Sequence, residues 1–100
     1  MKLVNSREII RSAQLNNHAI PQFNINNLEW TKCILTVSEE KKIPIILGVT
    51  KNVVEYIGGY KTIVGFVNGL LFDLKITVPV VLHLDHGRTL TDCKQAVEAG

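Results

Sequence analysis

The chain has 100 residues, of which 46% are hydrophobic and 20% are charged, and its formal net charge at neutral pH is +2. These proportions are those of an ordinary globular protein and exclude a disordered chain or a strongly basic surface for nucleic acid. No apolar stretch reaches the roughly 18 to 20 residues that a membrane-spanning helix needs, and the N-terminus lacks the apolar core of a secretion signal, so we expect a cytoplasmic protein with no nucleic-acid or membrane partner.

The first predicted element is a short amphipathic helix that begins after Ser6 and ends at Asn16–Asn17. Its apolar residues recur at helical spacing, and Ser6 is the candidate N-cap. A short strand over 18–24 follows and ends on the polar residue Asn24. His18 lies at the opposite end of this strand, so we predict a structural role for it.

The next predicted helix covers 28–42. Asn26 or Asn27 can cap it, and Glu29 suits a capping box led from Asn26. Apolar residues at i, i+3, i+4 and i+7 predict a stripe that faces the core; its members are Trp30, Cys33, Ile34 and Val37. The side chains predicted to face water or the rim are Thr31, Lys32, Glu39, Glu40 and Lys41.

A second apolar strand, over 43–50, ends on the hydroxyl residue Thr50. A short helical turn over 52–57 should stop at Gly58–Gly59, because paired glycines favour a break. A long helix over 60–76 follows. Its predicted core-facing residues are Ile63, Val67, Leu70 and Leu74, widened by Phe66 and Leu71.

The third predicted strand, within 78–87, is the most informative stretch, because an apolar run becomes polar at its C-terminal end. Side chains alternate along a strand, so His83 and Asp85 share one face with Val81. His86 falls where the chain leaves the strand, and alternation no longer fixes its direction there. Asp85 and His86 can therefore converge on one site.

The last predicted helix starts at Thr89, or alternatively at Thr91, and runs to Gly100. Its predicted core-facing residues are Cys93, Ala96 and Val97. The two cysteines, Cys33 and Cys93, lack the spacing of a metal site and are interpreted as reduced packing residues.

The predicted order is a helix followed by three strand–helix units, which indicates an α/β fold with parallel strands. Such a chain brings Asn24, Thr50 and the Asp85–His86 pair to one edge of the sheet. Three strands alone leave two open edges. We therefore expect residues 1–100 to be the N-terminal portion of a single (β/α)8 TIM-barrel domain, truncated after about three of its units.

The alternatives at this edge stay open on the residues alone. For Asp85–His86, a helix cap or an ion pair fits as well as catalysis. His83 and His86 are three apart, so a site of two histidines is conceivable, although a strand would place them on opposite faces unless the backbone turns. We favour His83 as a barrel-interior residue with a buried partner.

Four segments, in this order, resemble the N-terminal part of class II fructose-bisphosphate aldolases. They are Gln22–Glu29, Pro44–Thr50, Tyr56–Gly59 and Val78–Gly87. The similarity runs along essentially the whole chain and covers only the first portion of that family's barrel.

The resemblance implies a role for each candidate site residue. Asp85 would be the proton-transfer residue at the bond that is cleaved, and His86 a ligand of the catalytic Zn²⁺. Asn24 and Thr50 would lie in the substrate site, with Thr50 standing where many relatives have serine. The remaining zinc ligands would be histidines beyond residue 100. Lys51–Asn52 and Arg88 replace smaller residues expected from the family.

The implied activity is that of a lyase. It would cleave fructose 1,6-bisphosphate reversibly to dihydroxyacetone phosphate and glyceraldehyde 3-phosphate in glycolysis and gluconeogenesis, as a homodimer or larger homo-oligomer. Tagatose-bisphosphate aldolase shares these motifs and is the alternative enzyme, and a non-catalytic truncated barrel remnant is the alternative of another class. By themselves, the 100 residues should bind zinc weakly and be inactive.

Overall fold

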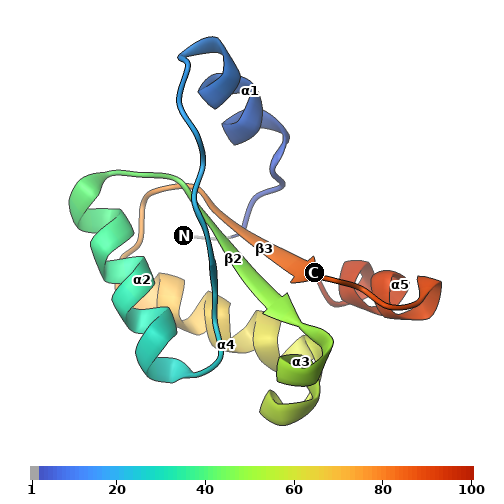
Figure 1. Cartoon of the computed structure of the whole chain (residues 1–100). Coiled ribbons are helices and arrows are strands. Elements are labelled where there is room, and N and C mark those ends of the chain that lie inside the picture. The colour runs from blue at the N-terminus through green and yellow to red at the C-terminus, as the bar shows by residue number, and fades with distance from the viewer. Residues whose placement is uncertain (1–2) are drawn as a thin grey trace.

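A computed structural model describes residues 3–100 as an α/β fold, which confirms the predicted fold class (Figure 1). In chain order the elements are α1 (Arg7–Leu15), β1 (Gln22–Asn24), α2 (Leu28–Lys41), β2 (Ile45–Thr50), α3 (Lys51–Ile57), α4 (Tyr60–Asp73), β3 (Val80–Asp85) and α5 (Leu90–Ala99). Within this described part of the chain, none of the helices combines the length and apolarity needed to cross a membrane.

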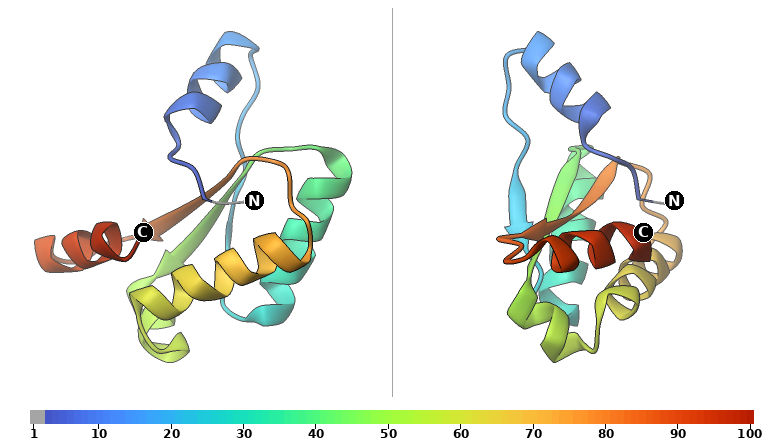
Figure 2. Two further views of the ribbon diagram at one scale, coloured as in Figure 1. Left: turned by 180° about the vertical axis from the view of Figure 1, so that it is seen from behind. Right: turned by 90° about the vertical axis from the view of Figure 1, so that its right-hand side faces the viewer.

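The three strands form one parallel sheet in the order β1-β2-β3. Asn24 pairs with Gly48, and Thr50 pairs with Asp85. The carboxyl ends of the strands therefore share one edge, as the sequence predicted. Helices α2 and α4 lie side by side against the sheet, α5 contacts α4, and α1 projects away from the sheet (Figures 1 and 2).

The core lies between α4, α2 and the helix-facing side of the sheet. Alternate strand residues fill it from one side, and the helical residues fill it from the other. Its most deeply buried members are Ile25, Leu35, Ile45, Leu47, Ile63, Val67, Leu71 and Val80. Each such side chain contributes about 1.5–3 kcal/mol by leaving water, so this layer holds β2 and β3 in place beneath the polar edge.

Of the predicted core stripe on α2, only Ile34 packs against the core, where it is partly buried. Trp30 is 51% exposed, and Cys33 and Val37 are exposed as well. The buried positions of α2 are Thr31, Leu35 and Ser38. Thr31, expected to face water, is fully buried. Its hydroxyl donates a 2.7 Å hydrogen bond to the Asn27 carbonyl, so its burial leaves no side-chain polar atom unpaired. Two faces of this helix can be buried, and the pattern alone favoured the wrong one.

The N-cap positions Ser6, Asn27 and Thr89 are among those predicted, but the hydrogen bonds at the first two helix starts differ in detail. In α1 the side chain of Asn5, not that of Ser6, accepts a hydrogen bond from a helix amide, that of Arg7. In α2 the cap is Asn27, whose Oδ1 accepts from Trp30 N at 2.8 Å, so the capping box between Asn26 and Glu29 does not form. Helix α5 is capped by Thr89 as predicted.

Two elements are shorter than predicted. β1 begins at Gln22 rather than at His18, which is exposed and lies outside the strand. α4 ends at Asp73 rather than at 76, because Lys75 adopts a left-handed conformation with φ 53° that cannot continue a helix. The break after α3 falls at Gly58, with φ 128°, as predicted.

Glu39, predicted to be solvated, instead binds the start of the chain segment that leads into β3. Its carboxylate accepts hydrogen bonds from the amides of Thr77 (2.7 Å) and Val78 (3.1 Å) and pairs with Lys42. The hydrogen bond from Lys42 and those from Thr77 lower the pKa of Glu39 to about 2. This carboxylate ties the C-terminal turn of α2 to the strand that carries the candidate site.

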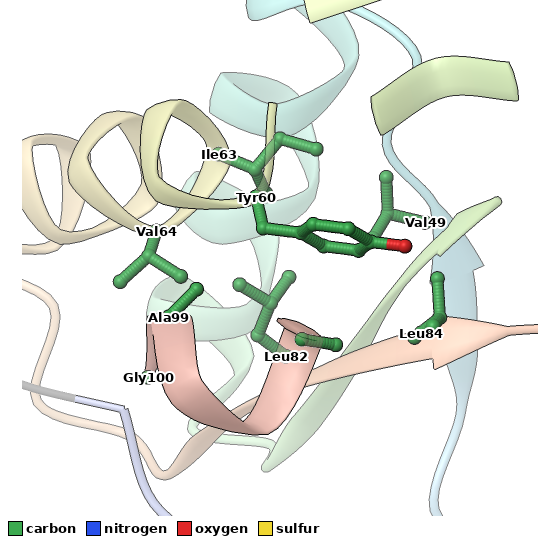
Figure 3. Close-up of a pocket in the computed structure, with 9 residues that line it drawn as sticks. Val49, Tyr60, Ile63, Val64, Leu82, Leu84, Ala99 and Gly100 are labelled. Atoms are coloured by element: carbon green, nitrogen blue, oxygen red, sulfur yellow. The ribbon is translucent and has the colours of Figure 1, made fainter. Parts of the chain in front are cut away.

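A small apolar cavity of about 50 Å³ separates α5 from α4 and the sheet (Figure 3). Tyr60 lies across it, beside Val49.

The prediction that Cys93 and Val97 face the core is wrong, since both are exposed. Cys33 is also exposed, so neither cysteine is a packing residue in the described structure.

Candidate active site

One face of the sheet is polar at its carboxyl edge. Residues paired in register lie on the same face of a pleated sheet, and alternate residues of each strand share that face. The members of this polar face are Gln22 and Asn24 from β1, Gly48 and Thr50 from β2, and His83 and Asp85 from β3. The helix-packed core lies on the other face, so polar groups are displayed here without disturbing it.

Gly48 makes room for the two amide side chains of β1. A Cβ built on Gly48 would lie 2.8 Å from Gln22 Nε2, closer than real Cβ atoms come, and 3.1 Å from Asn24 Oδ1, tighter than most real contacts. The glycine therefore lets both amides lie directly over the backbone of β2. Sequence reasoning did not identify Gly48, although a glycine inside an apolar strand is a known sign of close approach.

Asp85 lies between two imidazoles. Its Oδ1 is 3.8 Å from His86 Nε2 and 3.9 Å from His83 Nε2. The convergence of Asp85 and His86 is as expected, and it arises because His86 adopts a left-handed backbone with φ 55° that turns the chain out of the strand. His83 already shares a face of β3 with Asp85, so the turn at His86 brings both histidines close to one carboxylate.

The two histidines differ in exposure from the carboxylate that they flank. The His86 side chain is 88% exposed and that of His83 is 51% exposed, whereas Asp85 is 25% exposed. His83 faces the polar side of the sheet, as expected, but it is not buried within the described structure. A largely free imidazole next to a half-buried carboxylate can bind a cation while the carboxylate accepts or returns a proton.

Thr50 and Asn24 complete the row of polar side chains. Thr50 is the direct neighbour of Asp85 across the ladder. Asn24 is paired with Gly48 one strand further away, at two strand spacings, or about 10 Å, from β3. The structure thus brings all four predicted residues to one face and edge, with Thr50 beside Asp85 and Asn24 at a distance that suits a ligand lying across the sheet.

An ion pair between the buried Asp92 and the partly exposed Lys51 adjoins this edge and was not predicted. Lys51 Nζ lies 2.9 Å from Asp92 Oδ1, which also accepts a 3.2 Å hydrogen bond from the Tyr60 hydroxyl. Hydrogen bonding between the partners lowers the pKa of Asp92 and raises the pKa of Lys51. A single aspartate near a helix start gives no signal of this kind, because the lysine that it meets is far away in the sequence.

A second link joins the same segments. Arg88 donates a long hydrogen bond, 3.4 Å, to Asn52 Oδ1. Asn52 follows Lys51 in α3, and Arg88 lies in the turn that follows His86. Two residues noted as departures from the family pattern, Asn52 and Arg88, therefore contact each other.

The side chains at this edge include one good ligand for a metal ion. His86 offers an exposed imidazole nitrogen of the kind that zinc prefers. Within residues 3–100, however, no group of three His, Cys, Asp or Glu side chains is arranged to hold a metal ion. A catalytic zinc takes about three protein ligands, so the described residues fit as one part of a zinc site.

The chain is similar to proteins of known activity. A family model described as "Fructose-bisphosphate aldolase class-II" matches residues 4–100. The fructose-bisphosphate aldolase of Geobacillus stearothermophilus is 51% identical over 100 residues, and the 6-phospho-5-dehydro-2-deoxy-D-gluconate aldolase of Halalkalibacterium halodurans is 47% identical over the same length. Each match covers 100% of this chain and 35% of the relative, so the chain spans about a third of these relatives.

The fold is similar to that of a solved aldolase. The crystal structure of the YdjI aldolase from Escherichia coli K12 matches with a TM-score of 0.85 and 28% sequence identity. The match covers 98% of this chain and 37% of that chain. The arrangement of parallel strands and intervening helices is therefore shared with an aldolase over nearly all of the chain.

Proposed function

Because the chain belongs to the class II fructose-bisphosphate aldolase family, we propose that it is the N-terminal part of an enzyme that cleaves fructose 1,6-bisphosphate reversibly to dihydroxyacetone phosphate and glyceraldehyde 3-phosphate. The observation that carries the proposal is the family match over residues 4–100, supported by the meeting of Asp85 and His86 at the carboxyl edge of the sheet. Residues 1–100 would be the first portion of a single TIM-barrel domain.

Asp85 is the proposed proton-transfer residue. In the cleavage direction its carboxylate would take the proton of the hydroxyl at carbon 4, so that this oxygen becomes the aldehyde oxygen as the bond between carbons 3 and 4 breaks. In the synthetic direction it would return the proton. Its partial burial, at 25% exposure, and its position beside His86 support this role.

His86 is the proposed zinc ligand of this segment, with the other ligands expected beyond residue 100. When bound, Zn²⁺ supplies positive charge that stabilises negative charge developing on the ketose. Asp85 would stay outside the ligand set and remain free to move a proton. Thr50 and Asn24 would orient the substrate through the hydroxyl and the amide that they present on the same face.

The substrate is part of the proposal. The relative from Halalkalibacterium halodurans carries the name of a different phosphosugar aldolase at nearly the same identity, whereas tagatose-bisphosphate aldolase is not favoured by the relatives described above. The names of these relatives also support an enzyme over a non-catalytic remnant. A cytoplasmic location and a homodimer or larger homo-oligomer are proposed on family grounds alone.

The test uses the complete gene product. We expect cleavage of fructose 1,6-bisphosphate, loss of activity with a chelator, and recovery when Zn²⁺ is added back. Tagatose 1,6-bisphosphate and 6-phospho-5-dehydro-2-deoxy-D-gluconate should be cleaved more slowly. Faster turnover of either compound would make that compound the assigned substrate in place of fructose 1,6-bisphosphate. If the zinc-loaded protein cleaves none of the three, the proposed function is refuted.

A further inference from the structure

The ion pair of Lys51 with Asp92 joins the two chain segments that leave the candidate active site. Lys51 directly follows Thr50, the last residue of β2, and begins α3. Asp92 lies in the first turn of α5, just after the turn that contains His86. The pair therefore connects the exit of one strand with the exit of its neighbour.

Asp92 is held from three sides. Its Oδ1 accepts from Lys51 Nζ at 2.9 Å and from the Tyr60 hydroxyl at 3.2 Å, and its amide donates to Thr89 Oγ1 at 3.1 Å. The Lys51 ammonium also lies 5.1 Å from the centre of the Tyr60 ring, a cation–π distance. Asp92 is only 8% exposed, so its charge depends on these partners for compensation.

The turn that this cluster adjoins carries backbone strain. His86 has φ 55°, a left-handed conformation that costs a residue with a Cβ more free energy than it costs glycine. The turn from Asp85 to Thr89 has few anchors of its own, since Gly87 and Arg88 are exposed. Contacts with residues outside the turn should therefore stabilise its conformation.

The anchors come from three consecutive residues where β2 ends and α3 begins. Thr50 pairs with Asp85 at the start of the turn, and Asn52 accepts the long hydrogen bond from Arg88 within it. Lys51, between them, binds Asp92 just beyond its end. Of these links, only the one from Lys51 to Asp92 is both short and shielded from water, so it should dominate.

We propose that Lys51, Asp92 and Tyr60 are positioning residues for the active site, which fix α5 against α3 and thereby hold His86 in its left-handed turn beside Asp85. This inference rests on the proposed function for its catalytic consequence, but not for its structural one. Loss of the cluster should loosen the turn and reduce the affinity of His86 for zinc.

The test compares matched variants of the complete gene product. Asp92→Asn removes the buried charge, and Tyr60→Phe removes one hydrogen bond while keeping the ring. Glu55→Gln is the control, because Glu55 is the exposed second partner of the same lysine, at 4.0 Å. Amide hydrogen exchange of residues 86–90 is measured without metal, and Zn²⁺ affinity is measured by competition with a chelator.

Asp92→Asn should speed exchange in the turn by about tenfold or more and weaken Zn²⁺ binding by about tenfold, in the range seen when groups that orient a ligand are removed. Tyr60→Phe should do both to a smaller extent, and Glu55→Gln should do neither. If Asp92→Asn does not fold, Tyr60→Phe decides. Unchanged exchange in the turn, even with a lower melting temperature, would overturn the inference.

These outcomes are separable from those of the proposed function. A wild-type protein that fails to cleave any of the phosphosugars refutes the aldolase proposal, whereas the exchange measurement on the metal-free turn still decides the positioning role. Conversely, an active enzyme whose turn is indifferent to Asp92→Asn retains its proposed function and refutes the positioning role.

Discussion

Thr50 and Asp85 end neighbouring parallel strands in direct register, so their side chains lie next to each other on one face of the sheet. Each belongs to a different strand–helix unit, and the relationship exists only because both units end at the same level. A hydroxyl beside a carboxylate at the carboxyl edge of parallel strands is placed where α/β enzymes bind their ligands.

The hydroxyl of Thr50, rather than its methyl group, should matter for activity. We predict that Thr50→Ser keeps kcat/KM within about threefold, whereas Thr50→Val lowers it by about 10- to 100-fold, the value of one hydrogen bond to a charged or polar substrate group. Steady-state assays of fructose 1,6-bisphosphate cleavage measure both. A larger loss in Thr50→Ser than in Thr50→Val would show that the site uses the shape of the side chain and not its hydroxyl.

Asp85 and His86 should separate proton transfer from metal binding. Asp85→Ala should lower kcat by about 10²–10⁴-fold, the usual contribution of a general acid–base group, and leave zinc content nearly intact. His86→Ala should remove zinc and lower the affinity for zinc by at least about 100-fold. Removing a metal ligand should weaken binding more than removing a group that only orients a ligand, which typically costs about 10- to 100-fold in affinity. Metal analysis after dialysis, paired with kinetics, distinguishes them; similar metal loss in both variants would contradict the assignment.

Gly48→Ala should disturb the site more than the fold. The added Cβ would come within 2.8 Å of Gln22 Nε2 and 3.1 Å of Asn24 Oδ1, so both amides must shift away from β2. We expect at least a tenfold loss of kcat/KM, on the reasoning that small displacements of substrate-positioning groups are costly, with little change in melting temperature.

Two further variants control the Gly48 experiment. Gly65→Ala lies in α4, where an added Cβ meets nothing within 4 Å, and it should stabilise the protein by about 0.5–1 kcal/mol without changing activity. Adding Gln22→Ala to Gly48→Ala relieves the closest contact and should restore part of the lost activity. No recovery would mean that the displacement of Asn24 is independent of Gln22.

The strand ends were predictable, because each is marked by a local change in residue type. An apolar run gives way to Asn24, to Thr50 and to Asp85–His86, and alternation with helices makes the strands parallel. These three changes in residue type, together with the rule that the carboxyl ends of parallel strands meet at one edge, predicted the location of the candidate site from the sequence alone.

What could not be predicted depends on partners that are distant in the sequence. The buried face of α2 is decided by what packs against it, and a pattern that offers two faces leaves the choice to tertiary contacts. Asp92 is buried because Lys51 and Tyr60 come from other helices to meet it. The left-handed conformation at His86 was likewise not predictable, because the residue in that conformation is not a glycine or an asparagine.

Glu39 offers a prediction about stability and pH, because it is the one carboxylate whose pKa is lowered far, from 4.5 to about 2. A carboxylate with a depressed pKa in the folded state stabilises the fold at every pH above its ordinary value. That contribution declines as the pH falls from about 4.5 towards 2, because the carboxyl group of the unfolded chain is then protonated while that of the folded protein stays ionised down to about pH 2.

We therefore predict that Glu39→Gln lowers the urea midpoint of the complete gene product at pH 6, and that the gap to wild type narrows steadily between pH 4.5 and the acid limit of folding. The substituted amide keeps an oxygen that can accept from Thr77 or Val78 but loses the charge that pairs with Lys42. Glu40→Gln, at the exposed neighbouring position, is the matched control and should leave the midpoint close to wild type at each pH. A gap that stays constant from pH 6 to pH 3 would show that the hydrogen-bond geometry, and not the charge of Glu39, holds α2 to the start of β3.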